Sequence, residues 1–431
     1  MSWKSRYLAK SYLRSSLWII PIGAILLETA FAYVVHVFDS LHGWQFLGFG
    51  IEGAKVVSGT VVTFALSFIV FTFGSLLVAV QVASGQYTPR IIATTLLNDN
   101  VIRFTVGLFV FSLLFAIKTL NQTEKTIPQF GTLITGTLGL LCLVAFLFLI
   151  DYAARLLRPV SLVRRVGEDG LAVLRSVYPE ILDPMVPRPL LTRPEVDIER
   201  TVLHPAASEI VLAVDSNTLL AQADKAGGII ELVPKVGDFV GRDEPLFLLH
   251  GGAAQISDQT LLGTVIFGSE RTLEQDPLFA PRILVDIALK ALSPAINDPT
   301  TAVLAIDQLH RLLRAAGRRK LHTDYIENPT GELRVIFRTP SWDDFVQLAF
   351  TEIRFCGANN IQIARRLRAM LVNLANTLPG TRHPALHREA ELLDRTIEKF
   401  YTFEEDLALA RVPDTQGLGG STEIAVEEWA A

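Results

Sequence analysis

The histidines and cysteines of this chain do not occur in the patterns that metal or nucleophile chemistry needs. His383 and His387 are four residues apart and could share a metal ion on a helix. The acidic partner would be Glu389, however, and Pro384 places His383 at the entrance of that helix. There is no Cys-x-x-Cys pair, no Gly-x-Ser-x-Gly elbow and no Gly-x-x-x-x-Gly-Lys-Ser/Thr phosphate loop. We therefore expect no metal, no cofactor and no catalytic residue, which disfavours an enzyme.

One polar turn in the C-terminal half could bind an ion. Asp286, Ser293, Asn297 and Asp298 lie on and around a break between two predicted helices. The alternative is a helix–turn–helix corner that its own side chains satisfy. Asp298 is a good helix cap and Pro299 a good first helical residue, so this corner explains the same residues.

One carboxylate, Glu28, lies near the middle of a long apolar stretch. A charged group in that position is costly and is a candidate for transport or proton transfer. The alternative is a protonated or hydrogen-bonded Glu28 in the interior of a helix bundle. No cluster of acidic residues of the kind found in cation pumps accompanies it.

The composition shows which elements must position these residues. Half of the 431 residues are hydrophobic, only 19% are charged, and the mean hydropathy is +0.37. The apolar excess is concentrated in the first 150 residues, which excludes a plain soluble enzyme and a disordered chain. The net charge of −5 argues against a nucleic-acid binder. Cys142 and Cys356 lie in an apolar and a polar region, so we expect no disulfide.

Four stretches in this N-terminal part are long and apolar enough to cross a bilayer, which needs roughly 20 such residues. They lie at about 17–38, 56–83, 101–120 and 131–150. We expect residues 1–150 to form a four-helix transmembrane bundle in contact with lipid.

The lysines and arginines beside these spans predict their orientation. Ten lie on one side and three on the other, so the positive-inside rule puts both termini in the cytoplasm. The ten are Lys4, Arg6, Lys10, Arg14, Arg90, Arg103, Arg155, Arg158, Arg164 and Arg165, and the three are Lys55, Lys118 and Lys125. The alternative for the first span is a signal peptide cleaved near Ala30–Ala32, but the apolar run continues through Val37 and is longer than the apolar h-region of a signal peptide, which has about 7–15 residues.

The second span carries a seam of small and polar residues on an otherwise apolar helix. At about 100° per residue, the seam falls within a stripe of roughly 80°. Its members are Gly59, Thr63, Ser67, Gly74, Gln81 and Gly85. The seam is either a surface for close helix packing or the wall of a wetted pore or substrate path. The fourth span has similar small residues four apart, at Gly131, Thr135 and Gly139.

Arg90 follows the second span directly, after Thr88 and Pro89. Residues 91–97 could form a short amphipathic turn on the inner membrane face, with Arg90 at the level of the phosphate headgroups. We expect Arg90 to anchor the chain to the membrane.

Beyond the bundle the sequence predicts a cytosolic α+β region. Residues 151–200 read as a membrane-surface connector and a proline-rich linker, because five prolines lie between Pro179 and Pro194. Residues 201–270 read as a small β-rich module whose Gly-x-Ile and Val-Gly-Asp-x-Val patterns resemble a barrel-sandwich hybrid, the fold of biotinyl and lipoyl carriers. No lysine lies between the last of these strands and Lys290, so we expect no covalently carried cofactor.

Residues 271–411 read as mainly helical, and residues 412–431 as a disordered acidic tail. Predicted helices run from Pro281 to Leu292, from Pro299 to Gly317, from a capping box at Ser341 to about Cys356, and over 360–378 and 384–409. Residues 333–337 alternate in polarity and predict one strand within this part.

Two stretches, 80–90 (Val-Gln-Val-Ala-Ser-Gly-Gln-Tyr-Thr-Pro-Arg) and 291–302 (Ala-Leu-Ser-Pro-Ala-Ile-Asn-Asp-Pro-Thr-Thr-Ala), resemble the signatures of a known family. This is the family of bacterial predicted membrane proteins called domain-of-unknown-function 2254, and the resemblance covers essentially the full length. It implies a multi-pass protein of the bacterial inner membrane. It implies no catalytic or binding residues.

Three functions fit these features. The first is a homo-oligomeric channel or transport-like protein whose cytosolic domain assembles and gates it, because the seam continues through Arg90 into a large cytosolic region. The second is a membrane-anchored scaffold that binds a cytosolic protein partner, with the seam used only for packing. The third, a membrane-associated enzyme, lacks a triad, a metal set or a phosphate loop to support it.

Overall fold

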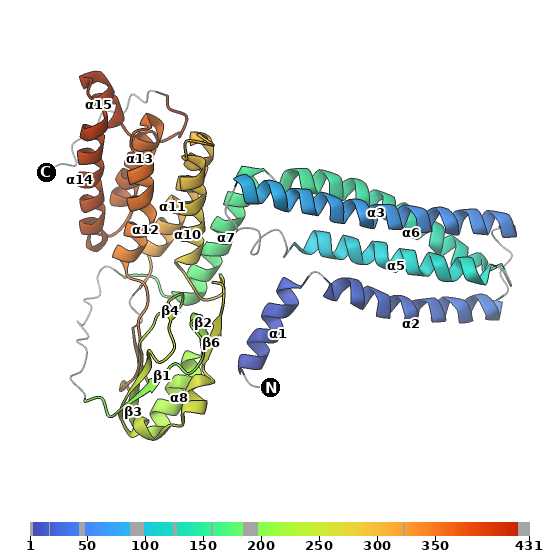
Figure 1. The fold of residues 1–431 in the computed structure, drawn as a ribbon, viewed down its shortest axis with the longest axis horizontal. Coiled ribbons are helices and arrows are strands. Elements are labelled where there is room, and N and C mark those ends of the chain that lie inside the picture. Colours follow the sequence, from blue (N-terminus) through green and yellow to red (C-terminus); the bar gives the residue numbers. More distant parts are fainter. Residues whose placement is uncertain are drawn as a thin grey trace. The chain divides into compact units, whose positions relative to one another are not determined.

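The computed structural model describes residues 3–16, 18–42, 48–86, 99–123, 127–156, 158–183, 197–321 and 324–420 (Figure 1). The described chain divides into two compact units. The bundle unit contains most of α1 (Trp3–Ser15) and the four long apolar helices. The α+β unit contains the first residues of α1 and everything from Val163 onward.

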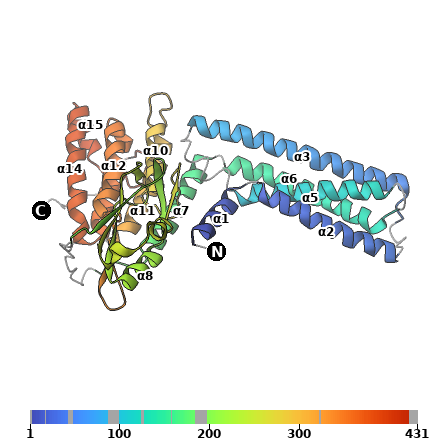
Figure 2. The same cartoon turned by 60° about the horizontal axis from the view of Figure 1, so that its bottom comes forward.

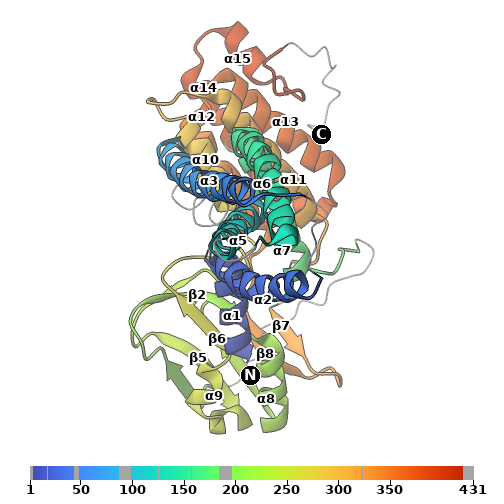
Figure 3. The same cartoon turned by 90° about the vertical axis from the view of Figure 1, so that its right-hand side faces the viewer.

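Four helices of the bundle unit are long and apolar enough to cross a membrane, as the sequence predicts. They are α2 (Ile19–His42), α3 (Ile51–Gln86), α5 (Asn100–Gln122) and α6 (Gln129–Leu156). Half of the apolar window of α5 is buried, against about a tenth to a fifth of the windows of the other three. The core of the bundle therefore forms around α5, at Phe109 and Phe115, with α2 and α6 beside it (Figure 3).

Polar side chains fix both ends of this bundle. Asp99 caps α5 by accepting from the Val101 amide at 2.9 Å, and it also accepts from the Tyr152 hydroxyl at 2.6 Å. At the other end of α5, the Asp39 carboxylate of α2 accepts from the amides of Phe130 and Gly131 at 3.0 and 2.9 Å. Asp39 thus satisfies the N-terminus of α6 from a different helix.

The α+β unit contains two sheets. The larger has the order β1-β5-β3-β8-β7 and the smaller the order β4-β2-β6. All their pairings are antiparallel except β3 with β8, which is parallel. The strands are β1 (Arg200–Leu203), β2 (Glu209–Val214), β3 (Gly228–Leu232), β4 (Phe239–Val240), β5 (Pro245–Gly251), β6 (Val265–Gly268), β7 (Tyr325–Glu327) and β8 (Leu333–Phe337). One apolar core lies between these strands and α8 (Ser216–Ala226), with Leu219, Ile230 and Phe247 fully buried.

The larger sheet corrects the predicted extent of the β-rich module. The strand at 333–337 does not stand alone among helices, because β8 pairs with β3, which lies about a hundred residues earlier in the chain. The module therefore draws strands from 325–337 as well as from 201–270. The barrel-sandwich resemblance did not predict this arrangement of two sheets.

A layer of helices completes the unit (Figures 1 and 2). The helices are α10 (Phe279–Ala291), α11 (Pro299–Gly317), α12 (Trp342–Gly357), α13 (Ile361–Thr377), α14 (His383–Phe400) and α15 (Glu404–Ala410). Two predicted caps are present. Asp298 accepts from the Thr301 amide at the start of α11, and Ser341 forms a capping box with Asp344 at the start of α12.

Three expectations for this unit are wrong. Within the predicted connector, α7 (Pro159–Val177) is a helix whose apolar side, including Val166 and Leu174, is fully buried. The helix expected over 384–409 is two helices, because residues 401–403 separate α14 from α15.

Residues 412–420, expected to be disordered, pack against α13. The buried Asp414 there accepts from three amides of its own loop, while the buried Arg365 side chain donates to the carbonyls of Val412, Gly419 and Gly420 at 2.7–3.1 Å. The prolines at 184–194 lie outside the described residues.

Candidate functional site

The polar turn predicted between α10 and α11 uses its side chains within the helix corner. The Ser293 hydroxyl donates to the Lys290 carbonyl at 2.6 Å, and Asp298 caps α11. Asn297 adopts a φ of +47°, a left-handed conformation that asparagine tolerates, and its amide donates to the Ser293 carbonyl. The structure therefore brings Ser293, Asn297 and Asp298 together, with their described hydrogen bonds made inside the corner.

Asp286 does not join that turn. It lies one turn after Arg282 on α10 and accepts from that guanidinium at 2.7 Å. The same guanidinium makes a two-pronged contact with Glu352 of α12, at 2.6 and 2.9 Å. This network joins α10 to α12, and it holds the pKa of Glu352 below its usual range because Arg282 donates to the carboxylate.

The histidine pair is also local. The His383 ring lies 3.1 Å from the Leu378 carbonyl oxygen, and its centroid is 6.1 Å from that of His387. Among the described residues, no group of three or more His, Cys, Asp or Glu side chains is placed to hold a metal ion.

Glu28 forms a buried ion pair across the bundle. Its side chain on α2 is 1% exposed, and its Oε2 accepts from Lys118 Nζ of α5 at 2.7 Å. The lysine side chain is 42% exposed, so the pair connects the interior of the bundle to its surface. The second carboxylate oxygen, Oε1, is buried and has no hydrogen-bond partner among the described atoms. In an apolar environment this pairing lowers the cost of the Glu28 charge that position alone would impose.

Lys118 is the residue that sequence analysis missed. It was counted with the charges of the loops, although it lies inside the predicted span at 101–120. The sequence signal for this ion pair is a lysine within one apolar span and a carboxylate within another.

The seam on α3 faces away from the bundle. Gly59 is half-buried, whereas Thr63, Ser67, Gly74 and Gln81 are exposed. A Cβ placed on Gly59 or Gly74 would meet no atom within 4 Å. The Thr63 and Ser67 hydroxyls donate to carbonyls one turn earlier on the same helix, at 3.0 and 2.8 Å. Gly85 lies near the end of α3, and Arg90 lies outside the described residues.

The opposite face of α3 holds the helix in the bundle. At about 100° per residue, the buried residues lie about 180° around the helix from the centre of the seam. They are Ala54, Ser58, Val61, Ala65, Phe68, Thr72 and Ala79. Phe68 stacks on Phe146 of α6 at 4.1 Å between ring centroids and contacts Phe109 of α5 at 5.6 Å. Packing within this one chain therefore does not use the seam.

The small residues of the fourth span do pack within the chain. A Cβ on Gly139 would lie 2.5 Å from Val61 Cγ2, so α3 and α6 approach closely there. The Thr135 hydroxyl is fully buried and donates to the Gly131 carbonyl at 2.9 Å. The small residues of α6 therefore pack against other helices of the same chain, whereas the seam glycines Gly59 and Gly74 of α3 contact no described neighbour.

One glycine pattern precedes α3. Residues 48–53 have the spacing Gly-x-Gly-x-x-Gly of a dinucleotide-binding turn. That motif requires a strand before the turn, whereas the described element before it is the helix α2, and the helix after it is a candidate membrane span. The context therefore does not support nucleotide binding at these residues.

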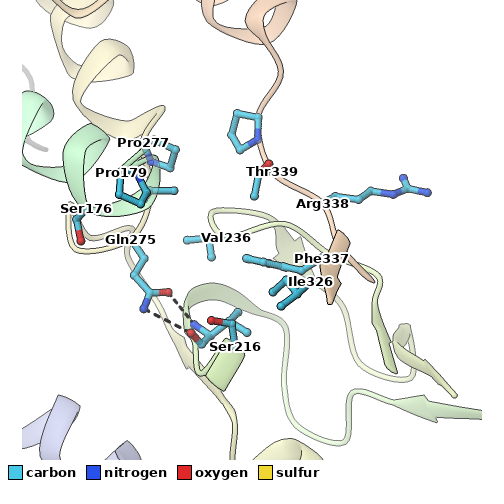
Figure 4. A pocket seen from close by; sticks show the side chains of 13 residues that line it. Ser176, Pro179, Ser216, Val236, Gln275, Pro277, Ile326, Phe337, Arg338 and Thr339 are labelled. Carbon is cyan, nitrogen blue, oxygen red and sulfur yellow. Dashed lines mark hydrogen bonds between the residues drawn. The ribbon is translucent and has the colours of Figure 1, made fainter. Parts of the chain in front are cut away.

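The α+β unit contains a cavity of about 380 Å³ next to β2, β7 and β8 (Figure 4). Its walls are mainly apolar, with Val236, Ile326 and Phe337 among them. The Gln275 side chain reaches across one side and bonds to the backbone amide and carbonyl of Val214, at 2.9 and 3.5 Å. Its amide is therefore already used in closing the end of β2.

Four apolar helices long enough to span a bilayer, with the buried Glu28 carboxylate paired between two of them, define a multi-span membrane protein with an α+β unit. The chain belongs to the family described as Predicted membrane protein (DUF2254), whose sequence model matches residues 14–373.

The relatives found extend this similarity over nearly the whole chain. Uncharacterized proteins of Mycobacterium bovis and Mycobacterium tuberculosis are each 25% identical over 421 residues, covering 92% of this chain and 79% of the relative. No solved structure matches the chain.

Proposed function

We propose that the protein is a homo-oligomeric channel or transport-like protein of the bacterial inner membrane, with the seam faces of α3 from several copies meeting around a common axis. Both termini would then lie in the cytoplasm, as the distribution of lysine and arginine favours. The α+β unit would assemble the copies and control the path between them. The path requires that the copies associate through the seam and also that the seam lines the common axis.

The observation that carries the proposal is the exposed seam on a helix whose opposite face is already packed. If the seam served only to pack the bundle, its residues would lie on the side of Ala65 and Phe68, not opposite them. Small residues allow two helix backbones to approach closely in lipid, where packing and hydrogen bonds drive association. A second copy of the same face is the partner that a closed symmetric assembly provides.

The chemistry of the seam also suits a wet path. The Thr63 and Ser67 hydroxyls bond to helix carbonyls but keep lone pairs that water or an ion can use. The Gln81 amide is exposed and makes no described hydrogen bond, so in pure hydrocarbon it would lack a partner. Lining a solvated axis supplies these groups with partners.

Cysteine cross-linking in native membranes tests the assembly. In a Cys356→Ser background, which removes the exposed thiol, we expect Ser67→Cys to give a disulfide-linked dimer on mild oxidation. The matched control is Ala65→Cys, two residues away on the buried face, which should stay monomeric. Leu140→Cys, 67% exposed on α6, controls for random collision. Equal cross-linking at 67 and 140, or none at 67, would contradict the seam interface.

Flux through proteoliposomes tests the path itself. We expect the reconstituted protein to pass small ions, and Gly74→Leu to reduce the flux by filling the seam. Val144→Leu, an exposed position on α6, should leave it unchanged. If the protein cross-links through residue 67 but passes no ion or small solute, the channel function is contradicted and the oligomer is retained. A stoichiometric cytosolic partner recovered from membranes would then favour the scaffold.

A further inference from the structure

A groove between α7 and α11 gathers four arginines in the α+β unit. Its volume is about 390 Å³, within the range of small-ligand pockets. Arg175 lines it from α7, and Arg311 and Arg314 line it from α11, with Arg318 directly after that helix. We call these four residues the arginine groove.

The local sequence explains why the four side chains converge. Residues 311, 314 and 318 are three and four apart, so they lie within about 60° on one side of α11. α7 approaches this side closely because it carries glycines at the contact. A Cβ on Gly167 would lie 2.3 Å from Gln308 Oε1, and one on Gly170 would lie 3.1 Å from Leu312 Cδ2, both on α11. The approach brings Arg175 to the other side of the groove.

The acidic and titratable groups around the groove are already engaged. Asp307 of α11 pairs with Arg366 at 2.5 Å, and Glu168 of α7 pairs with Arg164 at 2.8 Å. His310 lies 2.8 Å from Asn373 Oδ1, and burial lowers the pKa of its imidazole, so the ring is neutral at pH 7.

The arginines themselves have little compensation. Arg175, Arg314 and Arg318 make no side-chain hydrogen bond or ion pair within the described part of the chain. Arg311 makes one long contact, with Gln308 Oε1 at 3.5 Å, and its charge also acts on Glu168, whose carboxylate bonds to Arg164. Like charges one turn apart on a helix repel each other. An unpaired cluster of guanidinium groups in a concave site is therefore suited to a ligand with several negative charges.

We propose that the arginine groove binds a small, multiply charged phosphate-bearing anion. The planar guanidinium donates two parallel hydrogen bonds that match phosphate oxygens. Among the described residues, the apolar side chains that line the groove are Leu171 and Ala315, and no Phe, Tyr or Trp side chain lines it. The contacts that the groove offers are therefore mainly those of guanidinium groups, which suit phosphate oxygens.

The structural alternative is that the arginines complement the negative C-terminal ends of their helices. That effect falls off within the last turn, and it accounts for Arg175 near the end of α7 and Arg314 near the end of α11. Arg311 lies six residues before Gly317, the last residue of α11, so helix-end charge does not explain it.

Calorimetric titration of the full-length protein in nanodiscs of neutral lipid tests the proposal, with inorganic triphosphate as the probe. We expect saturable binding that is weakened at least tenfold by Arg314→Gln and by Arg175→Gln. The matched control is Arg395→Gln, an exposed arginine on α14 with the same change of charge, which should bind as the wild type does. Equal weakening by the control, or no binding of any phosphate source, would overturn the site.

A second arm distinguishes a free anion from a lipid headgroup. The same proteins are placed in nanodiscs that contain phosphatidic acid, with no soluble phosphate, and their thermal unfolding is followed. A rise in Tm that Arg314→Gln abolishes and Arg395→Gln retains assigns the groove to a phosphomonoester lipid. Binding of triphosphate without this rise assigns it to a soluble anion.

Discussion

Gly139 of α6 lies against Val61 of α3 so closely that a methyl group on the glycine would come within 2.5 Å of Val61 Cγ2. Valine has a stiff χ1, so it cannot swing aside freely. We expect Gly139→Ala to separate the two helices and lower the free energy of unfolding by about 1–3 kcal/mol, the usual effect of overpacking. The free energy can be measured by denaturant titration of the purified protein in mixed micelles.

The control for this change is Gly136, which lies three residues earlier on α6. A Cβ on Gly136 would meet Val57 Cγ1 at 3.6 Å, an ordinary contact. Gly136→Ala should therefore unfold at the wild-type denaturant concentration. Alanine favours a helix more than glycine does, so helix propensity cannot explain a loss at either position. Equal losses at both glycines would contradict a specific effect of the Val61 contact.

Removing one partner of the Glu28–Lys118 pair should cost more than removing both. Lys118→Met leaves a carboxylate that is 1% exposed without its cation. The double variant, Glu28→Gln with Lys118→Met, also removes the carboxylate charge that Lys118→Met alone leaves buried without a cation. We expect a coupling free energy of about 1–2 kcal/mol in a double-mutant cycle, in the range of interhelical polar pairs in membrane proteins.

Lys55→Met, which removes a lysine that has no described ion pair, is the control for that cycle and should change the unfolding free energy little. Additive effects of Glu28→Gln and Lys118→Met would show that the two side chains do not act as a pair in lipid.

The segment after α15 should be essential for stability. Arg365 is 1% exposed, and its guanidinium donates to carbonyls of residues 412, 419 and 420. Ending the chain after Arg411 leaves this buried charge without those acceptors, and we expect a loss of about 3–5 kcal/mol. Removing only residues 422–431 preserves the acceptors and should leave the thermal unfolding of the α+β unit unchanged. Similar unfolding temperatures for the two truncations would contradict the role of the segment.

Asp276 should make stability depend on pH. Burial raises the pKa of its carboxyl to about 6, although Arg271 lies 3.4 Å away and opposes the shift. Because the folded pKa exceeds the unfolded value of 3.8, the contribution of Asp276 is fully present below about pH 4 and is lost as pH rises through 6. Asp276→Asn keeps an acceptor for the Leu278 amide and should flatten the fall in Tm between pH 4.5 and 7.5. Asp406→Asn, at an exposed position, should leave that fall as in the wild type.

The four membrane helices could be predicted because their signal is local. Length and hydropathy are enough to recognise a span, and short-range rules placed the caps at Asp298 and Ser341. The same local information could not show which side of α3 packs. That choice depends on Val61 and Phe68 meeting Gly139 and Phe146, which lie 78 residues later in the chain.

The pairings that escaped prediction are all distant in sequence. Glu28 and Lys118 are 90 residues apart, and Arg365 meets its acceptors about 50 residues later. The arginine groove has a sequence signal on α11, the spacing of residues 311, 314 and 318. Its fourth member, Arg175, lies on α7, within the segment for which the sequence predicts a membrane-surface connector and a linker.

The parallel pairing of β8 with β3 places four other strands, α10, α11 and about a hundred residues of chain between neighbouring strands of one sheet. This raises the contact order of the unit, and such non-local pairing folds slowly. A fragment that stops at residue 270 would expose the free edge of β3, with its buried Ile230 and Leu232, and is expected to aggregate. The sheet and the helical layer are therefore a single folding unit that has to be expressed whole.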